Sequence, residues 1–119
     1  MTVCEAINKT KTLYPNTYGE DVLREYLYKL DLNIKQNIID KYKEGENISL
    51  TPYDENTVLL VDEPYTDVYV FWLQAWIDYW NGDYDKYNSS IAMYSAVYDA
   101  FAAQYHNNHT PLKNKLKFW

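Results

Sequence analysis

The stretch FWLQAWIDYWNGDYDKY, residues 71–87, decides the fold class because a turn in it joins two helical patterns. Before the turn, apolar residues three or four positions apart cover a broad helical face: Val68, Trp72, Ala75, Trp76, Tyr79 and Trp80. Gly82 suits a left-handed helix C-cap, and Asp83 suits the N-cap of a following helix through Tyr84 to Tyr105. These residues predict an antiparallel helical hairpin, with a single kinked helix as the alternative.

Two Thr-x-x-Glu patterns predict helix starts nearer the N-terminus. Thr2 with Glu5, and Thr17 with Glu20, have the spacing of a capping box, in which each partner satisfies an unpaired backbone N–H group. The first helix is expected to stop before Pro15, since the residue before a proline avoids the helical region.

The second helix is expected to bury one apolar stripe. Its members recur every three or four positions: Leu23, Tyr26, Leu27, Leu30, Ile34, Ile38 and Tyr42. Asp31 interrupts the stripe and could cap a second helical segment there. Gly45 is the expected end of the helix.

Turn residues punctuate the segment from 45 to 64 and enclose two short apolar runs, 48–50 and 57–61. The second run is partly β-branched, so a short β-hairpin or an extended insertion is expected. Pro64 suits the first turn of the next helix. The sequence thus predicts a mainly α fold, a small helical bundle with a long helical hairpin and this short insertion.

Composition narrows the function classes. The chain has 119 residues, which suits one domain, and its formal net charge of −6 argues against tight, sequence-independent binding of duplex DNA. Cys4 is the single cysteine, so no internal disulfide can form. The sequence shows neither a signal peptide nor the ~20 consecutive apolar residues of a membrane span. We therefore expect no membrane association and place the protein in a reducing cytoplasm.

The last nine residues, PLKNKLKFW, differ from the rest of the chain because they carry three lysines and no acid. We expect residues 1–110 to form the helical domain and residues 111–119 to form a basic, extended arm; a frayed terminus is the alternative. Burial of aromatic rings is favourable, so the arm is expected to dock on a partner. The candidate contact residues are Leu112, Lys113, Lys115, Leu116, Lys117, Phe118 and Trp119.

Catalytic motifs are missing from the sequence. There is no glycine-rich phosphate loop, nucleophile elbow or clustered Ser/His/Asp set. His106 and His109 are three residues apart, but metal sites need three or four ligands. Asp83 and Asp85 resemble the start of a calcium loop that lacks its glycine and its final glutamate. We expect no enzyme, no metal and no cofactor.

Aromatic residues are unusually abundant, with 14 tyrosines and four tryptophans. Grooves that stack single-stranded nucleic acid are basic, and tyrosine is enriched in protein interfaces. We expect Trp72, Leu73, Trp76 and Ile77 to make the core. Surplus tyrosines on the helix backs should contact other subunits: Tyr84, Tyr87, Tyr94 and Tyr98.

Residues 64–94, PYTDVYVFWLQAWIDYWNGDYDKYNSSIAMY, resemble small structural proteins of tailed phages and Firmicutes prophages. Members of that group share a Pro-Tyr-Asp/Thr start, an Asn-Gly-Glu/Asp turn and a Tyr-Asn-Asn/Ser-Ser motif in this order. The resemblance covers roughly residues 57–110, and the group is similar to head-to-tail connector proteins, also called adaptor or neck proteins.

The resemblance implies a structural virion protein whose helical subunits form a homo-oligomeric ring that joins the portal and capsid to the tail. Its partners would be the portal and tail-completion proteins, and DNA would pass through without specific binding. The protein would be assembled in the bacterial host cytoplasm and end in the virion. Two alternatives remain: a small acidic phage-encoded regulatory or anti-host protein-binding module, and an aromatic-lined ligand-binding module.

Overall fold

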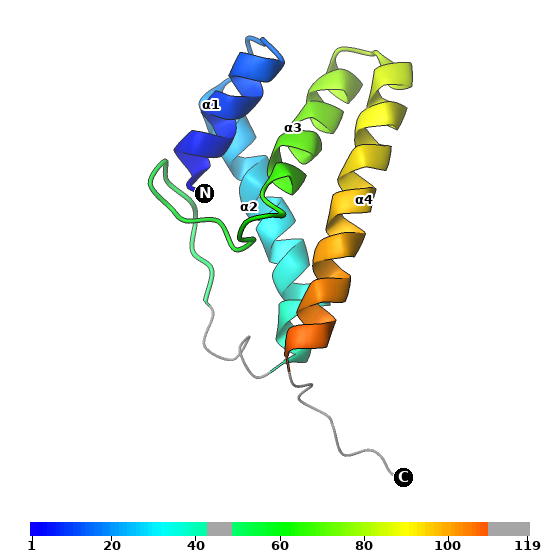
Figure 1. Cartoon of the computed structure of the whole chain (residues 1–119). Helices are drawn as coiled ribbons and strands as arrows, with labels where there is room; N and C mark the ends of the chain where they lie inside the picture. The colour runs from blue at the N-terminus through cyan, green and yellow to red at the C-terminus, as the bar shows by residue number, and fades with distance from the viewer. Residues whose placement is uncertain (43–48, 110–119) are drawn as a thin grey trace.

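The computed structural model describes residues 1–42 and 49–109, which fold into a small, mainly α helical bundle. Its helices run alternately up and down (Figure 1). They are α1 (Val3–Leu13), α2 (Glu20–Asn37), the short 3-10 helix η1 (Ile39–Lys41), α3 (Asp67–Trp80) and α4 (Tyr84–Asn108). The predicted fold class is therefore confirmed.

The capping box predicted for the first helix is present. Thr2 Oγ1 accepts a hydrogen bond from Glu5 N at 3.2 Å, and Glu5 Oε1 accepts one from Thr2 N at 2.8 Å. The hydrogen bond from the Thr2 backbone lowers the pKa of the Glu5 carboxyl. The helix ends at Leu13, before Pro15, as the sequence predicts.

The second helix differs from its prediction at both ends. Gly19 is the N-cap of α2 and no side chain caps it, so the box predicted from Thr17 and Glu20 does not form. The helix passes through Asp31 unbroken because that carboxylate bonds to groups outside α2. It ends at Asn37 and η1 follows, whereas Gly45 lies outside the described residues.

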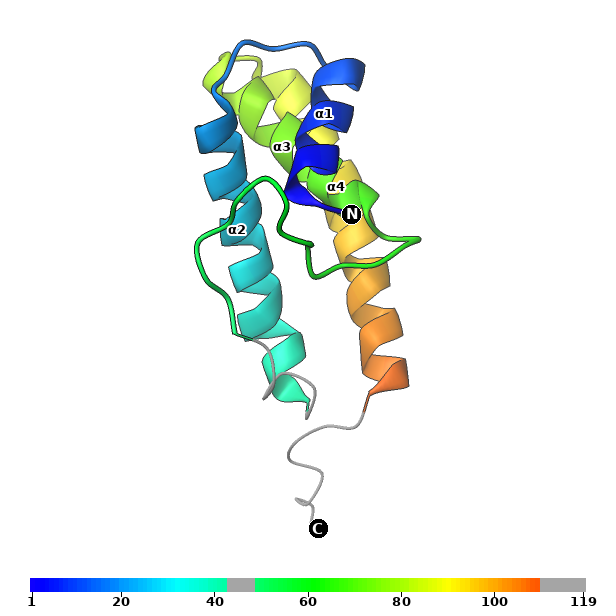
Figure 2. The same ribbon diagram turned by 90° about the vertical axis from the view of Figure 1, so that its left-hand side faces the viewer.

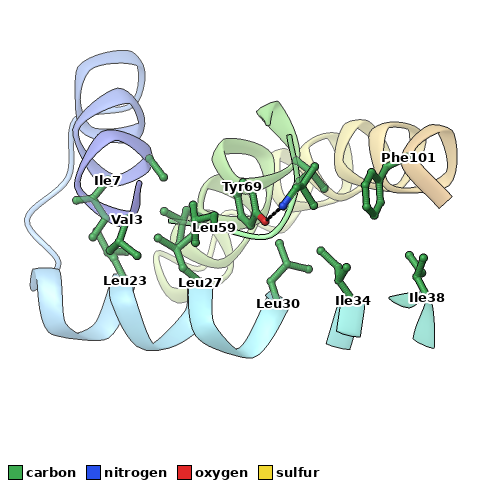
Figure 3. Packing of buried hydrophobic residues seen from close by; sticks show 14 of the residues in the cluster. Val3, Ile7, Leu23, Leu27, Leu30, Ile34, Ile38, Leu59, Tyr69 and Phe101 are labelled. Carbon is green, nitrogen blue, oxygen red and sulfur yellow. Dashed lines mark hydrogen bonds between the residues drawn. The ribbon is translucent and has the colours of Figure 1, made fainter. Parts of the chain in front are cut away.

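The core forms around the stripe that the sequence predicts on α2 (Figure 3). Leu23, Leu27, Leu30, Ile34, Ile38 and Tyr42 are buried, and Tyr26 is half-buried. Val3 and Ile7 of α1 meet one end of this stripe, and Phe101 of α4 meets the other. The middle is filled by Leu59 and by Tyr69 of α3.

Residues 49–66, named the strap here, run across the bundle between α2 and α3 (Figure 2). Within the described residues the strap contains no β-hairpin, so that finer prediction is not met; position 48 lies outside them. Val58 instead forms an isolated antiparallel bridge with Thr2, and Val3 N donates to Thr57 O at 2.9 Å. The run 57–61 thus supplies a backbone acceptor, Thr57 O, for an N–H group at the start of α1 that has no partner within the helix. An isolated two-stranded hairpin would be only marginally stable.

A buried carboxylate fastens the strap to α2 and α3. Asp31 is fully buried and accepts hydrogen bonds from the hydroxyls of Tyr53 and Tyr69, each at 2.6 Å, and from Leu60 N at 3.0 Å. Burial raises the pKa of the Asp31 carboxyl, and the three hydrogen bonds oppose that shift. Burial and the nearby carboxylate also raise the pKa of both tyrosine hydroxyls.

The third helix lies at the centre of the bundle and begins at Asp67, three residues after the start predicted from Pro64. The intervening residues form turns, in which Tyr65 N donates to Asp62 O at 3.0 Å. Of the four residues predicted to form the core, two are buried, Leu73 and Ile77. The other two are half-buried, and of these Trp72 packs against the core whereas Trp76 does not belong to it.

The predicted helical hairpin is confirmed, and the kinked single helix is excluded. Gly82 has φ of 76°, a left-handed conformation that favours glycine. Asp83 then caps α4, because its Oδ1 accepts a hydrogen bond from Lys86 N at 3.2 Å. The two helices lie side by side and antiparallel in Figures 1 and 2.

Candidate functional site

The side of α4 that faces away from the bundle is the strongest candidate for an interaction surface. We name it the outward face of α4, and it consists of Ala92, Met93, Ala96, Ala100 and Ala103, all exposed. Their spacing of three and four places them on one side of the helix. The side chain of Met93 is large and apolar, and the residue is 51% exposed.

The part of this face before Asp99 carries no charge, whereas exposed Asp99, three positions after Ala96 and four before Ala103, lies on the same side of the helix. Residues 87–98 contain no aspartate, glutamate, lysine, arginine or histidine, and Asp99 is the first ionisable group after Lys86 other than tyrosine. Solvent-facing sides of helices normally carry charged and polar residues. High helix propensity could explain the alanines alone, but it does not explain an exposed methionine and the lack of charge.

The position of α4 in the bundle explains why this face is open. α4 lies at the side of the bundle along α3, and in the described part of the chain no other element covers its opposite side (Figures 1 and 2). Within the helix itself, which the structure describes throughout, Phe101 is the one buried residue. A helix of 25 residues thus leaves most of its surface to solvent or to a partner.

Two of the four predicted interface tyrosines lie near the N-terminus of α4. Tyr84 is 59% exposed, and its ring centroid lies 5.7 Å from that of Tyr79, which is also exposed. Tyr87 is half-buried against the same Tyr79 ring, at 5.5 Å. These rings form a small aromatic group beside the α3–α4 turn, at one end of the outward face.

The other two predicted interface tyrosines face into the bundle. The Tyr94 ring lies 5.0 Å from that of Trp72, and the Tyr98 hydroxyl donates to Asn33 Oδ1 at 3.0 Å. Burial raises the pKa of both phenols, and nearby Asp99 raises it further. Both side chains therefore hold α4 to α3 and α2 within the chain.

A continuous group of rings between α2 and α3 takes up much of the aromatic excess. The Tyr26 ring lies 5.3 Å from Trp76 and 5.0 Å from Trp80, and Tyr18 lies 5.0 Å from Trp80. Trp72 Nε1 donates to the Tyr26 carbonyl at 2.9 Å. Aromatic pairs at such distances stabilise the fold beyond their buried area, so these rings serve packing inside the bundle.

The remaining predicted contact residues, in 111–119, lie outside the described residues. At the C-terminal end of α4, the His109 ring stacks on Tyr105 at 3.7 Å, and His106 and His109 lie 5.4 and 6.0 Å from Tyr42. In residues 1–42 and 49–109 no group of three or more His, Cys, Asp or Glu side chains is placed to hold a metal ion.

The outward face of α4 is not among the contact surfaces that the sequence predicts. A signal for it was present, because Ala92, Ala96 and Ala100 repeat at intervals of four and Ala103 follows at three, and residues 87–98 carry no charge. The tyrosines of the same helix are the stronger sequence signal for a contact surface, because tyrosine is enriched in protein interfaces.

Comparisons with known proteins place the chain in no family: no protein-family model, no curated protein and no solved structure matches it. Among the helices described, none combines the length and the apolar character needed to cross a bilayer. The case for a function therefore stands on the residues of the chain and their geometry.

Proposed function

We propose that the protein is a structural subunit of a tailed-phage or prophage particle, a head-to-tail connector protomer that acts by assembling with copies of itself and performs no chemistry. The observation that carries the proposal is the outward face of α4, an exposed strip of alanines with Met93 that carries no charge before Asp99. Contiguous exposed apolar surface of this kind marks interaction sites.

Charge favours a second copy of the chain as the occupant of this face. Every copy has a formal net charge of −6, so copies repel one another over most of their surface. Contact between them is least unfavourable where the surface is neutral, and residues 87–98 supply such a surface. Like-charged subunits can therefore approach through α4.

The size of the side chains favours a helix as the contacting element. Alanines at positions 92, 96, 100 and 103 leave the backbone of α4 accessible along about three turns. The distance between packed helix axes depends on the side chains at the contact, and small ones allow close approach. A neighbouring helix can thus pack along the outward face, with Met93 filling its edge.

The connector assignment rests on the resemblance of residues 64–94 to small phage structural proteins together with this face. A ring requires a heterologous contact, in which two different surfaces of neighbouring subunits meet and the rotation closes. In that arrangement α4 of one subunit packs on another surface of the next. Portal and tail-completion proteins would bind the two ends of the ring.

Solution mass tests the assembly. Light scattering of the full chain should give a multiple of its 14.2 kDa mass, and Ala96→Glu should reduce the mass to that of one chain. The glutamate would place a carboxylate inside the contact, where loss of hydration costs several kcal/mol for an unpaired ion. Ala96 is exposed, so the subunit itself should keep its helical circular dichroism.

Ser95→Glu is the matched control because Ser95 is also exposed on α4 but points to a different side of the helix. It adds the same charge, one residue away, and should leave the mass of the assembly unchanged. A wild-type chain that stays a single chain at ~0.1 mM would contradict the proposal and favour the regulatory-module alternative. If Ala96→Glu keeps the wild-type mass, as Ser95→Glu should, the outward face of α4 is excluded as the contact.

Electron microscopy separates the connector from other assemblies. Closed rings with a central passage support it, and their absence from Ala96→Glu would tie the ring to α4. A symmetric dimer that does not extend would contradict the connector proposal, because isologous contacts close at two subunits.

A further inference from the structure

A hollow with aromatic walls lies where the strap runs alongside α2 (Figure 2). Its volume is about 190 Å³, and most of its exposed lining is apolar. Tyr28, Pro52 and Tyr53 line it, and the rings of the two tyrosines lie 5.1 Å apart, edge to face. An apolar cavity of ~150 Å³ can hold one benzene ring, so this hollow has room for one aromatic side chain.

Arg24, the single arginine of the chain, also lines the hollow. The residue is half-buried, and in the described part of the chain no ion pair includes it. A guanidinium without a carboxylate partner is free to stack on an aromatic face, which arginine does readily. An aromatic occupant of the hollow would therefore gain a contact that an aliphatic one would lack.

Carboxylates are numerous around the hollow. Asp21 and Glu25 line it, and Asp54 and Glu55 follow directly after Tyr53 in its wall. All four carboxylate residues are exposed, and among the ion pairs of the described residues only Glu25 takes part in one. The surroundings of the hollow therefore attract a segment that carries positive charge next to an aromatic ring.

We propose that residues 112–119 of the same chain dock on this hollow, with one ring of the Phe118–Trp119 pair inside it. That segment carries three lysines and no acid, and its two aromatic residues follow the last lysine. Both its charge and its rings thus complement the site. The occupant comes from the chain itself, so the contact does not depend on the proposed assembly through α4.

The length of the arm allows this contact. At the C-terminal end of α4, the His109 ring lies 6.0 Å from that of Tyr42, which follows α2 and η1. Tyr28 lies nine residues before the end of α2 at Asn37, which is about 14 Å along the helix axis. An extended segment as long as residues 110–118 spans up to ~30 Å. This length exceeds the rise along α2 and leaves room for a path around the end of the helix.

The strength of the contact favours the chain's own arm over the arm of another copy. One buried ring and a few exposed ion pairs bind weakly, with a dissociation constant on the order of 1 mM. A short flexible tether supplies an effective concentration in the mM range. Docking within one chain is therefore well populated, whereas docking between separate chains at ~10 μM is not.

Paramagnetic broadening in nuclear magnetic resonance spectra of the full ¹⁵N-labelled chain tests the contact. A nitroxide is attached at Asn114→Cys in a chain with Cys4→Ser, so that the arm carries the one thiol. The backbone amide signals of Asp21, Arg24 and Tyr28 should lose most of their intensity. The same pattern is expected when Ala96→Glu is added to make the chain a single subunit, so this proposal and the proposed function can fail separately.

Two variants sharpen the test. Phe118→Ser combined with Trp119→Ser should reduce the broadening at Arg24 about fivefold or more, because ring burial drives the contact. Asp21→Lys should reduce it severalfold through repulsion of the lysines. Its matched control is Asp85→Lys, which reverses the charge of another exposed aspartate, on α4, and should leave the broadening unchanged. Equal effects of the two charge reversals would contradict docking at this site.

A mixture of two samples identifies which chain supplies the arm. Unlabelled chains that carry the nitroxide are mixed with ¹⁵N-labelled chains that lack it, and no broadening at Arg24 is expected. Broadening in the mixture as strong as in the single sample would assign the arm to another copy and overturn docking within one chain. Broadening confined to the end of α2, at Gln36 and Asn37, would show an arm that leaves the hollow open and would also overturn the proposal.

Discussion

The substitution Tyr69→Phe tests the polar network that fastens the strap to the bundle. The Tyr69 hydroxyl is fully buried, donates to Asp31 Oδ1 at 2.6 Å and accepts from Val61 N at 2.8 Å (dashed line in Figure 3). Phenylalanine keeps the ring and removes only this oxygen. The change therefore breaks two hydrogen bonds without opening a large cavity.

The expected loss of stability follows from the two bonds. A hydrogen bond to a charged group contributes about 1.5–3 kcal/mol, and a buried N–H left without a partner costs about 1–3 kcal/mol. Val61 is fully buried, so water cannot replace the lost acceptor. Tyr69→Phe should thus lower the free energy of unfolding by about 3–5 kcal/mol, a large part of the ~5–15 kcal/mol of a typical domain.

Urea unfolding at pH 7, followed by circular dichroism, measures this loss by linear extrapolation. Tyr53→Phe is the matched control because its hydroxyl donates to the same carboxylate at 2.6 Å but caps no backbone N–H. The control should cost only about 1–2 kcal/mol, since the ring is half-buried and water can reach the site.

The order of the two variants decides whether the hydroxyl of Tyr69 satisfies both the carboxylate and the strap. If Tyr69→Phe costs no more than Tyr53→Phe, or less than about 1 kcal/mol, the buried Val61 N–H does not depend on that hydroxyl. The account of how the strap is held would then be wrong.

Two further predictions concern Asp31 and Gly82. Burial raises the pKa of the Asp31 carboxyl, so the folded state binds its proton more tightly than the unfolded state. The stability of the wild type relative to Asp31→Asn should therefore fall as the pH rises from ~4 through that raised pKa, which urea unfolding at several pH values measures. A rise in relative stability over this range would mean that the three hydrogen bonds outweigh burial. Gly82→Ala should lower the free energy of unfolding by about 1–2 kcal/mol, measured by thermal unfolding, because φ of Gly82 is 76°, although a Cβ there meets no heavy atom within 4 Å. Gly82→Asn should lower it less. An alanine variant as stable as the wild type would contradict the left-handed cap.

Most features that depend on neighbouring residues were predicted well from the sequence, although the box expected from Thr17 and Glu20 does not form. The Thr2–Glu5 capping box, the buried stripe of α2 and the Gly82–Asp83 turn all involve residues within a few positions of one another. Their hydrogen bonds and spacing are set by helix geometry alone. The helical hairpin followed directly from them.

Features that depend on distant residues were predicted poorly. The sequence suggests Asp31 as the cap of a second helical segment, yet its partner Tyr69 lies 38 positions away. For the run 57–61 the sequence predicts a strand of a short β-hairpin or an extended insertion; no hairpin forms in the described residues, and Val58 pairs with Thr2. In each case the sequence suggests a role with nearby residues, but the group bonds to a residue far away in the sequence that only the packed bundle brings close.

The candidate surfaces divide in the same way. The sequence by itself determined where α4 begins, that it is long, and that residues 87–98 carry no charge. Only the tertiary structure decided that Tyr94 and Tyr98 turn toward Trp72 and Asn33 while the alanines face away. The physical reason is that periodicity defines the sides of a helix, but which side is buried depends on the elements that pack against it.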